Sequence, residues 1–150
     1  MSIFARLHMA KKAKNNLIST NISRYNNYTM AKKILIVDDQ PDILTLLKDK
    51  FKFEGYEVLT ATDGQEALKK AQEEGPDIVL LDLMLPKIDG FKVCGLLKAD
   101  TRYQKIPVIM FSARAQESDK ELAKEVGADL YLEKTADINQ VSAAVKSILS

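Results

Sequence analysis

Cysteine is almost absent from this chain, because Cys94 is the only one among its 150 residues. A single cysteine excludes an internal disulfide, which fits a reducing cytoplasm, and we expect Cys94 and the lone histidine, His8, to be inert. Long apolar runs are missing too: Asp82 interrupts the longest one before it approaches the roughly 18 residues of a membrane helix. The N-terminus lacks the apolar core of about 7–15 residues that a secretory signal needs. These absences predict a cytoplasmic protein without a membrane partner.

Acidic residues are absent from residues 1–30, which carry five basic side chains: Arg6, Lys11, Lys12, Lys14 and Arg24. Because the whole chain has a net charge of +1, residues 31–150 together carry a charge of −4. Such a mildly acidic segment has no electrostatic footprint for nucleic acid, and we expect no direct contact with it. Residues 1–30 are rich in Asn, Ser and Thr, and we expect a disordered basic leader. Three interpretations of this leader stay open: an upstream-start artefact, a basic tether to an acidic surface, and an organellar presequence.

Residues 31–150 alternate strand and helix patterns five times, which predicts one α/β domain. Short aliphatic runs bounded by turn residues predict buried parallel strands at residues 34–37, 58–61, 78–81, 108–111 and 130–133. Helical spacing of apolar residues predicts five helices, which begin at Pro41, after Asp63, at Phe91, at Glu117 and at Ile138. The expected fold is a doubly wound five-stranded parallel sheet of order 2-1-3-4-5 with helices on both faces.

Local signals mark the ends of several helices. The run from Asp63 to Glu66 is a variant capping box that predicts the start of the second helix. Three glycines, each between a helix and the next strand, predict left-handed C-terminal caps at Gly55, Gly75 and Gly127. The fourth helix has only a thin apolar stripe, Leu122 and Val126, so we expect it to be among the less stable elements.

Polar side chains follow four of the aliphatic runs directly: Asp38 and Asp39, Asp82, Ser112, and Lys134. In a parallel sheet these positions emerge at one carboxyl edge, where open α/β folds place their sites. Three carboxylates gathered there repel one another unless a cation lies among them, and oxygen ligands suit Mg²⁺. A carboxylate is also a nucleophile toward phosphorus, while a hydroxyl and an ammonium can bind phosphoryl oxygens. The pattern predicts Mg²⁺-dependent phosphoryl transfer.

These residues, in this order, resemble the receiver domain of bacterial two-component response regulators. The resemblance covers residues 32–149 and includes Pro86 and Gly90, four and eight residues after Asp82. It implies a flavodoxin-like fold in which Asp82 accepts phosphate from a sensor histidine kinase or a histidine phosphotransfer protein. It also implies catalysis by Asp82, Ser112 and Lys134 of the domain's own phosphorylation and slow dephosphorylation, without turnover of a separate substrate.

The same resemblance implies roles for further residues. Asp39, Asp82 and the main-chain carbonyl of Met84 would bind Mg²⁺ directly, and Asp38 would do so through water. Ser112 and Tyr131 would form a switch pair, in which the hydroxyl moves toward the phosphate and the aromatic ring turns inward.

The resemblance also implies which residues set the lifetime of the phosphate and which surface transmits the signal. Met84 and Arg114 would flank the phosphate and set its lifetime, with Arg114 either paired to an acid on the fourth helix or covering the phosphate. The signal would leave toward a downstream protein through the fourth helix, fifth strand and fifth helix.

The sequence departs from the family pattern after Lys134, where Thr135 replaces the usual proline. A cis bond before a residue other than proline costs about 2.5–4 kcal/mol, so we expect a trans bond there, which puts the placement of Lys134 in question. Only 16 residues follow Lys134, enough for the last helix, and the chain resembles the stand-alone regulators of the family.

Two other classes of protein compete with this interpretation. Phosphatases with an aspartate nucleophile use similar groups, but that class resembles Asp-x-Asp after the first strand, whereas this chain has Asp38 and Asp39 adjacent. A flavin-binding domain of the same topology needs a phosphate loop rich in glycine and hydroxyls after the first strand, and the run from Gln40 to Asp42 is not one.

Overall fold

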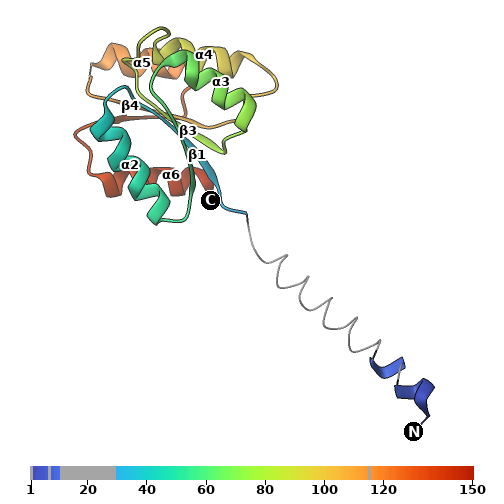
Figure 1. The fold of residues 1–150 in the computed structure, drawn as a ribbon. Coiled ribbons are helices and arrows are strands. Elements are labelled where there is room, and N and C mark those ends of the chain that lie inside the picture. The colour runs from blue at the N-terminus through green and yellow to red at the C-terminus, as the bar shows by residue number, and fades with distance from the viewer. Residues whose placement is uncertain (1, 7, 11–29, 115) are drawn as a thin grey trace. The chain divides into compact units, whose positions relative to one another are not determined.

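A computed structural model describes residues 2–6, 8–10, 30–114 and 116–150, and the chain divides into two units, Met1–Met30 and Ala31–Ser150 (Figure 1). In the first unit, residues 3–6 and 8–10 are helical. The predicted disorder of residues 1–30 falls mostly outside the described residues and stays a prediction. None of the helices in the described part of the chain is both long and apolar enough to span a bilayer.

The second unit contains the predicted sheet. Its strands are β1 (Lys33–Val37), β2 (Glu57–Ala61), β3 (Ile78–Leu81), β4 (Val108–Ser112) and β5 (Leu130–Glu133). All neighbours are parallel, and their order is β2-β1-β3-β4-β5, as predicted. The order reverses at β1, which lies between β2 and β3, so the sheet has the expected switch point at the ends of β1 and β3.

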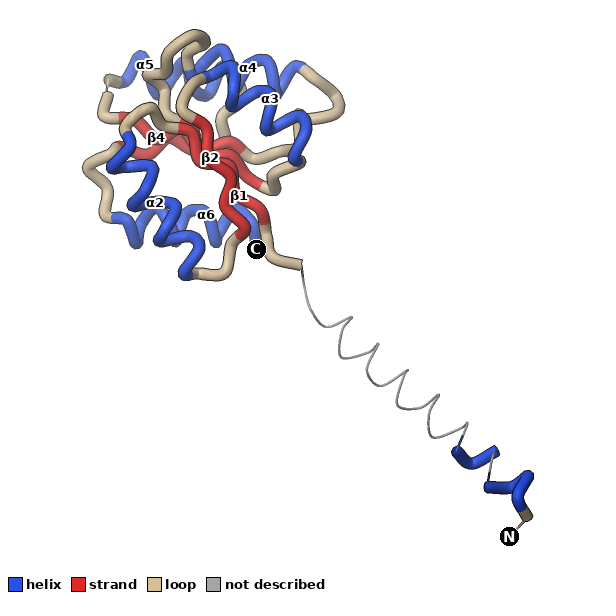
Figure 2. The backbone as a smooth tube through the Cα atoms, viewed as in Figure 1, coloured by secondary structure: helices blue, strands red, loops and turns tan. Residues whose placement is uncertain are grey.

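Five helices cover the two faces of this sheet, as predicted for residues 31–150. They are α2 (Pro41–Phe53), α3 (Gly64–Glu74), α4 (Gly90–Ala99), α5 (Glu117–Glu125) and α6 (Ile138–Leu149). Figure 2 shows α2 and α6 on one face and α3, α4 and α5 on the other. Alternate residues of the strands supply the two cores: Leu35 and Val37 pack toward α3, α4 and α5, whereas Ile34 and Ile36 pack toward α2 and α6.

The helix ends follow the predicted chemistry with one difference. Gly55, Gly75 and Gly127 have positive φ angles of 93°, 57° and 93°, the conformation that glycine adopts without steric cost. Asp63 caps α3 by accepting a hydrogen bond from the Glu66 N–H at 2.8 Å. The Glu66 side chain accepts from the N–H of Thr62, not from that of Asp63, so the reciprocal half of the predicted capping box is wrong.

Helix α5 packs partly through residues that were not predicted, although Val126 contacts the core as expected. Its buried positions are Asp119 and Ala123, and Leu122 is 39% exposed. The prediction overestimated the burial of Leu122, because it assigned the large apolar side chains of this helix to the face that packs on the sheet. Close packing against the sheet instead uses the small Ala123, and Val126 contributes a half-buried contact just after the helix.

Candidate functional site

The carboxyl ends of β1 and β3 bring three carboxylates together. The Asp38 N–H donates to the Ala61 carbonyl at 3.1 Å and the Asp82 N–H donates to the Val37 carbonyl at 2.9 Å, so sheet bonding continues one residue past the strands. One carboxylate oxygen from each of Asp38, Asp39 and Asp82 lies within 4.8 Å of the other two. Asp38 and Asp82 are buried and Asp39 is exposed, which leaves the cluster open to solvent on one side.

Lys134 reaches this cluster from the end of β5. Its Nζ lies 2.7 Å from Asp38 Oδ2 and 2.9 Å from Asp82 Oδ2, and its side chain is only 11% exposed. The Lys134 N–H also donates to the Ser112 carbonyl at 2.8 Å, which fixes the backbone beside β4. No peptide bond in the described part of the chain is cis, so the bond to Thr135 is trans, as predicted. The doubt about the placement of Lys134 is therefore removed, because the trans loop still places its ammonium group between two carboxylates.

Burial and charge act in opposite directions on these groups. Burial raises the pKa of Asp82 above the ordinary aspartate value, and the hydrogen bonds from Lys134 and the Met84 N–H offset only part of this increase. Burial alone would lower the pKa of Lys134, but its contacts with Asp38 and Asp82 outweigh burial and raise the pKa. The lysine therefore stays protonated, and the Asp82 carboxylate is less stable as an anion than an exposed one.

The loop between β3 and α4 folds back over Asp82. The Met84 N–H donates to Asp82 Oδ1 at 3.1 Å, and the Gly90 N–H donates to the Leu83 carbonyl at 2.8 Å. A Cβ atom at Gly90 would overlap the Asp82 carbonyl oxygen, so only glycine allows this close approach. Lys87 has a positive φ of 67°, a conformation that costs about 1–2 kcal/mol outside glycine. The loop thus stores some strain next to the site.

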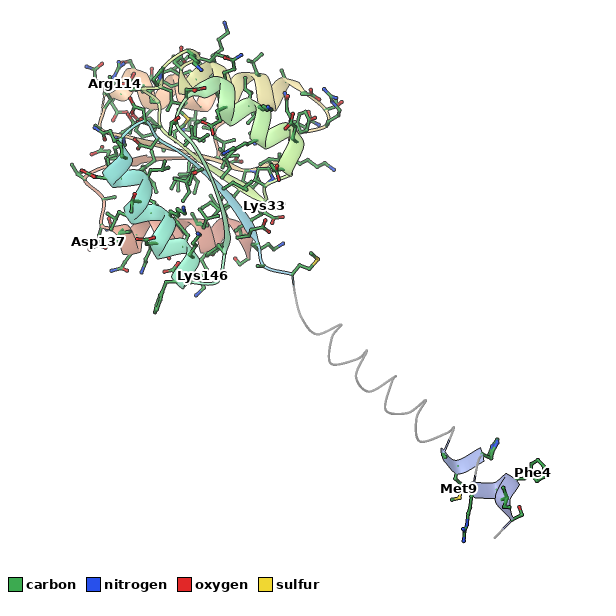
Figure 3. All side chains as sticks on the ribbon, viewed as in Figure 1. Phe4, Met9, Lys33, Arg114, Asp137 and Lys146 are labelled. Carbon is green, nitrogen blue, oxygen red and sulfur yellow. The ribbon has the colours of Figure 1, made fainter. Side chains whose placement is uncertain are left out.

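Ser112 and the loop after β4 form the other side of the site. Ser112 is fully buried, and its Oγ accepts a hydrogen bond from the Arg114 N–H at 3.2 Å. The Arg114 guanidinium pairs with Asp119 at the start of α5 (Arg114 is labelled in Figure 3). Of the two alternatives left open for Arg114, pairing with an acid on this helix is therefore the one observed. Tyr131, the other predicted switch residue, is half-buried and donates its hydroxyl to the Arg114 carbonyl at 2.6 Å.

A cavity of about 450 Å³ opens beside the carboxylates, and Asp39, Met84 and Arg114 are among its lining residues. The predicted lifetime residues, Met84 and Arg114, therefore border one space next to the acidic cluster, and the Met84 side chain is 56% exposed. The cavity leaves space beside Asp39, Met84 and Arg114.

The residues of the cluster fit a hard divalent cation such as Mg²⁺. They offer oxygen atoms, which Mg²⁺ prefers, and the open side leaves room for the waters that it retains. Asp38 Oδ2 is buried, and the Lys134 ammonium lies 2.7 Å from it. A buried anionic oxygen in that position is stabilised by a nearby cation.

Two contacts in the loops around the site were not predicted from the sequence. Gln40 places its Oε1 3.4 Å from Lys134 Nζ, and Lys87 pairs with Asp63 at 3.2 Å across the strained loop. The position of Gln40 directly after Asp38 and Asp39 is the only feature of the sequence that could have indicated its contact with Lys134. Nothing in the sequence marks Lys87, since a lysine is rarely found at positive φ.

A doubly wound sheet with this cluster at its switch point is the arrangement expected of a phosphoryl-accepting signalling domain. Residues 34–146 match the response regulator receiver domain family. The chain belongs to this family, so it is a receiver domain of two-component phosphorelay signalling, and nothing supports the alternative of an aspartate-nucleophile phosphatase.

Curated relatives and solved structures agree with this assignment. The alkaline phosphatase synthesis transcriptional regulatory protein PhoP of Bacillus subtilis is 50% identical over 122 residues, which are 80% of this chain and 49% of that protein. The DNA-binding dual master transcriptional regulator RpaA of Synechocystis is 43% identical over 117 residues, 78% of this chain and 48% of that protein. The chemotaxis response regulator CheY4 of Vibrio cholerae superposes with a TM-score of 0.75 at 30% identity, covering 80% of this chain and all of CheY4. This chain spans about half the length of the curated relatives.

Proposed function

We propose that Asp82 is the residue that accepts the phosphoryl group. It is one of the two buried carboxylates of the cluster, and it has Lys134 on one oxygen at 2.9 Å and the Met84 N–H on the other at 3.1 Å. In the transfer, one Asp82 oxygen forms a bond to phosphorus while the bond from phosphorus to the donor's imidazole nitrogen breaks, and that nitrogen takes a proton from water. The product is an acyl phosphate on Asp82.

Lys134 and Ser112 stabilise the transferred group. The ammonium of Lys134 already lies beside Asp82 and stays protonated, so it offsets negative charge on a phosphoryl oxygen without reorganisation. Ser112 ends β4 next to β3, and its hydroxyl can donate to a second phosphoryl oxygen. These groups act only on the domain's own carboxylate, so the protein is a self-modifying switch and not an enzyme with turnover.

Asp38, Asp39, Asp82 and the Met84 carbonyl would hold Mg²⁺. When bound there, Mg²⁺ supplies positive charge that offsets the carboxylates and the phosphoryl oxygens. The support is the cluster of three carboxylates itself, with one oxygen of each within 4.8 Å of the others and one side open to solvent.

The output surface comprises α5, β5 and α6, and Ser112 and Tyr131 would be its switch pair. Tyr131 lies on β5 with its hydroxyl held outward by the loop that follows Ser112, so a shift of that loop alters this face. The partners would be a sensor histidine kinase or histidine phosphotransfer protein upstream and a target protein downstream, in the cytoplasm.

The stand-alone organisation stays a prediction, and the expectation of no direct contact with nucleic acid disagrees with a relative named as DNA-binding. One curated relative about twice as long as the matched segment is named as DNA-binding, so a whole protein built on this domain could include such an activity. A downstream target reached through the output surface is compatible with either arrangement.

The test is phosphorylation by acetyl phosphate with Mg²⁺, followed by mass spectrometry. Wild-type protein should gain one phosphoryl group, and Asp82→Asn should gain none, because an amide does not attack phosphorus. Asp49→Asn, at an exposed position of α2, is the matched control and should react like wild type. A phosphoryl group on the Asp82→Asn variant would refute the assignment.

A further inference from the structure

Arg114 joins three parts of the domain through three different groups. Its guanidinium binds both carboxylate oxygens of Asp119: Nε lies 3.1 Å from Oδ2, and Nη2 lies 2.9 Å from Oδ1. Its N–H donates to Ser112 Oγ, and its carbonyl accepts from the Tyr131 hydroxyl. One residue therefore contacts the site hydroxyl, the output strand β5 and the first turn of α5.

Asp119 depends on this contact. Its side chain is only 6% exposed, whereas that of Arg114 is 45% exposed. In the described part of the chain, Arg114 is the one cation within ion-pair distance of Asp119. A buried carboxylate that loses its only cation is strongly disfavoured. The contact with Arg114 therefore stabilises the buried position of Asp119 in the first turn of α5.

Helix α5 has few other attachments at this end. Its N-cap residue, Gln116, makes no side-chain capping bond, and its buried residues are Asp119 and Ala123. The remaining ion pair to β5, Lys120 with Glu133 at 3.3 Å, is solvent-exposed and contributes little. The pair of Arg114 and Asp119 is therefore a main connection between the first turn of α5 and the site.

Arg114 also borders the cavity beside the carboxylates, together with Asp39 and Met84. A phosphoryl group carries a charge of about −1.5 to −2 at neutral pH, more than a carboxylate. A guanidinium binds either anion through its planar donors, and the Nε and Nη2 groups that hold both oxygens of Asp119 cannot hold a phosphoryl group in the same way at the same time.

We propose that Asp119 is a positioning residue that keeps Arg114 away from Asp82, and that a phosphoryl group on Asp82 competes with Asp119 for Arg114. This inference rests on the proposed role of Asp82 as phosphoacceptor. When Arg114 moves to the phosphoryl group, Asp119 loses its cation and the first turn of α5 loosens. The Arg114 carbonyl moves too, and the Tyr131 hydroxyl is released. The competition thereby links the chemistry at Asp82 to both α5 and β5.

A double-mutant cycle on the rate of phosphorylation by acetyl phosphate tests this competition. Asp119→Asn weakens the hold on Arg114 with little change of shape, so the half-saturating concentration of acetyl phosphate should fall about five-fold or more. In an Arg114→Met background the same Asp119→Asn change should have no effect, because no guanidinium remains to be released. A purely structural role for Asp119 would change both backgrounds alike.

A second measurement follows hydrogen exchange in residues 117–120, and compares the unphosphorylated variants and phosphorylated wild type with unphosphorylated wild type. Asp119→Asn and Arg114→Met should each accelerate exchange there, and phosphorylation of wild type should produce the same acceleration. Asp100→Asn is the matched control, because Asp100 pairs with Arg102 through the same two donor groups at the exposed end of α4. It should change neither the rate nor the exchange.

The outcomes separate the two proposals. If wild type is not phosphorylated on Asp82, the proposed function fails and this inference fails with it. If wild type is phosphorylated but Asp119→Asn has equal effects in both backgrounds, or no effect, only the competition is refuted.

Discussion

Lys134, at the end of β5, donates a hydrogen bond of 2.9 Å to Asp82, at the end of β3, although β4 separates the two strands in the sheet. A long flexible side chain bridges this distance along the carboxyl edge of the sheet. The contact places a positive charge beside the carboxylate that we propose to be the nucleophile, and it requires neither a proline nor a cis bond after Lys134.

Magnesium should stabilise the wild-type domain. A ligand that binds only the folded state adds about 2.7 kcal/mol at a concentration of 100 times its Kd. Asp39→Ala and Asp82→Ala each remove a proposed ligand and should abolish the increase in Tm on adding MgCl₂, measured by differential scanning fluorimetry. Asp49→Ala, an exposed carboxylate on α2, should keep it. Equal increases in all variants would contradict the metal assignment.

Asp82→Asn should stabilise the domain without metal at neutral pH, by a few degrees in Tm. The folded state raises the pKa of Asp82, mainly through burial, so ionisation of this carboxyl at neutral pH favours unfolding. Wild type regains this stability as the pH falls through the raised pKa toward the ordinary value of 3.8, and the variant does not. The difference in Tm should therefore shrink in acid. A constant difference across this range would show that the charge of Asp82 is not its cause.

Ser142 on α6 should stabilise the domain through Glu54, just after α2. The Ser142 hydroxyl donates to Glu54 Oε2 at 2.6 Å, and this bond is the main cause of the lowered pKa of Glu54. Ser142→Ala should cost about 0.5–1.5 kcal/mol at neutral pH in urea unfolding. Because a lowered pKa stabilises the folded state only above the ordinary glutamate value of 4.5, the cost should decrease as the pH falls below it. A cost that grows in acid would exclude the carboxylate as the partner.

Phosphorylation should change amide exchange across residues 114–133, which include α5 and β5. The cause is the attachment of this segment to the site through Arg114 and Tyr131. Hydrogen exchange with mass spectrometry, with Asp82→Asn treated identically as the control, measures the change. A response limited to the loops that touch Asp82 would argue against transmission to the output surface.

The phosphorylated state should decay slowly. Met84 is a poor acceptor and Arg114 has no acceptor, so neither can align a water molecule for attack on phosphorus. The double change Met84→Asn, Arg114→Glu introduces such acceptors and should shorten the half-life of the acyl phosphate about ten-fold or more. Loss of phosphate from protein freed of acetyl phosphate is the measurement. An unchanged half-life would show that these two positions do not set the rate.

The sequence predicted most of the site because strand ends obey a simple geometric rule. Asp38 and Asp82 follow buried strands, Ser112 ends β4, and Lys134 follows β5, which is half-buried and not buried as predicted; parallel strands bring their carboxyl ends to one edge. Contacts that depend on side-chain conformation could not be predicted in this way. The acid on α5 that binds Arg114 was left open because Glu117, Asp119 and Glu121 all lie near the start of that helix.

Packing of short helices was also beyond prediction. The buried face of α5 presents Ala123 and the charged Asp119, and only the contact with Arg114 makes a buried carboxylate acceptable there. The positive φ of Lys87 arises from the fold of the loop over Asp82, which depends on the close approach of Gly90. Neither feature has a periodic or compositional signal.

Chemical trapping of the acyl phosphate tests the central claim most directly. Borohydride reduces an aspartyl phosphate to homoserine, so wild-type protein treated with acetyl phosphate, Mg²⁺ and then borohydride should contain homoserine at position 82. Asp38 and Asp39 should remain aspartate in the same tandem mass spectra, and omission of Mg²⁺ should remove most of the signal. Homoserine at position 38 or 39, with Asp82 intact, would contradict the account.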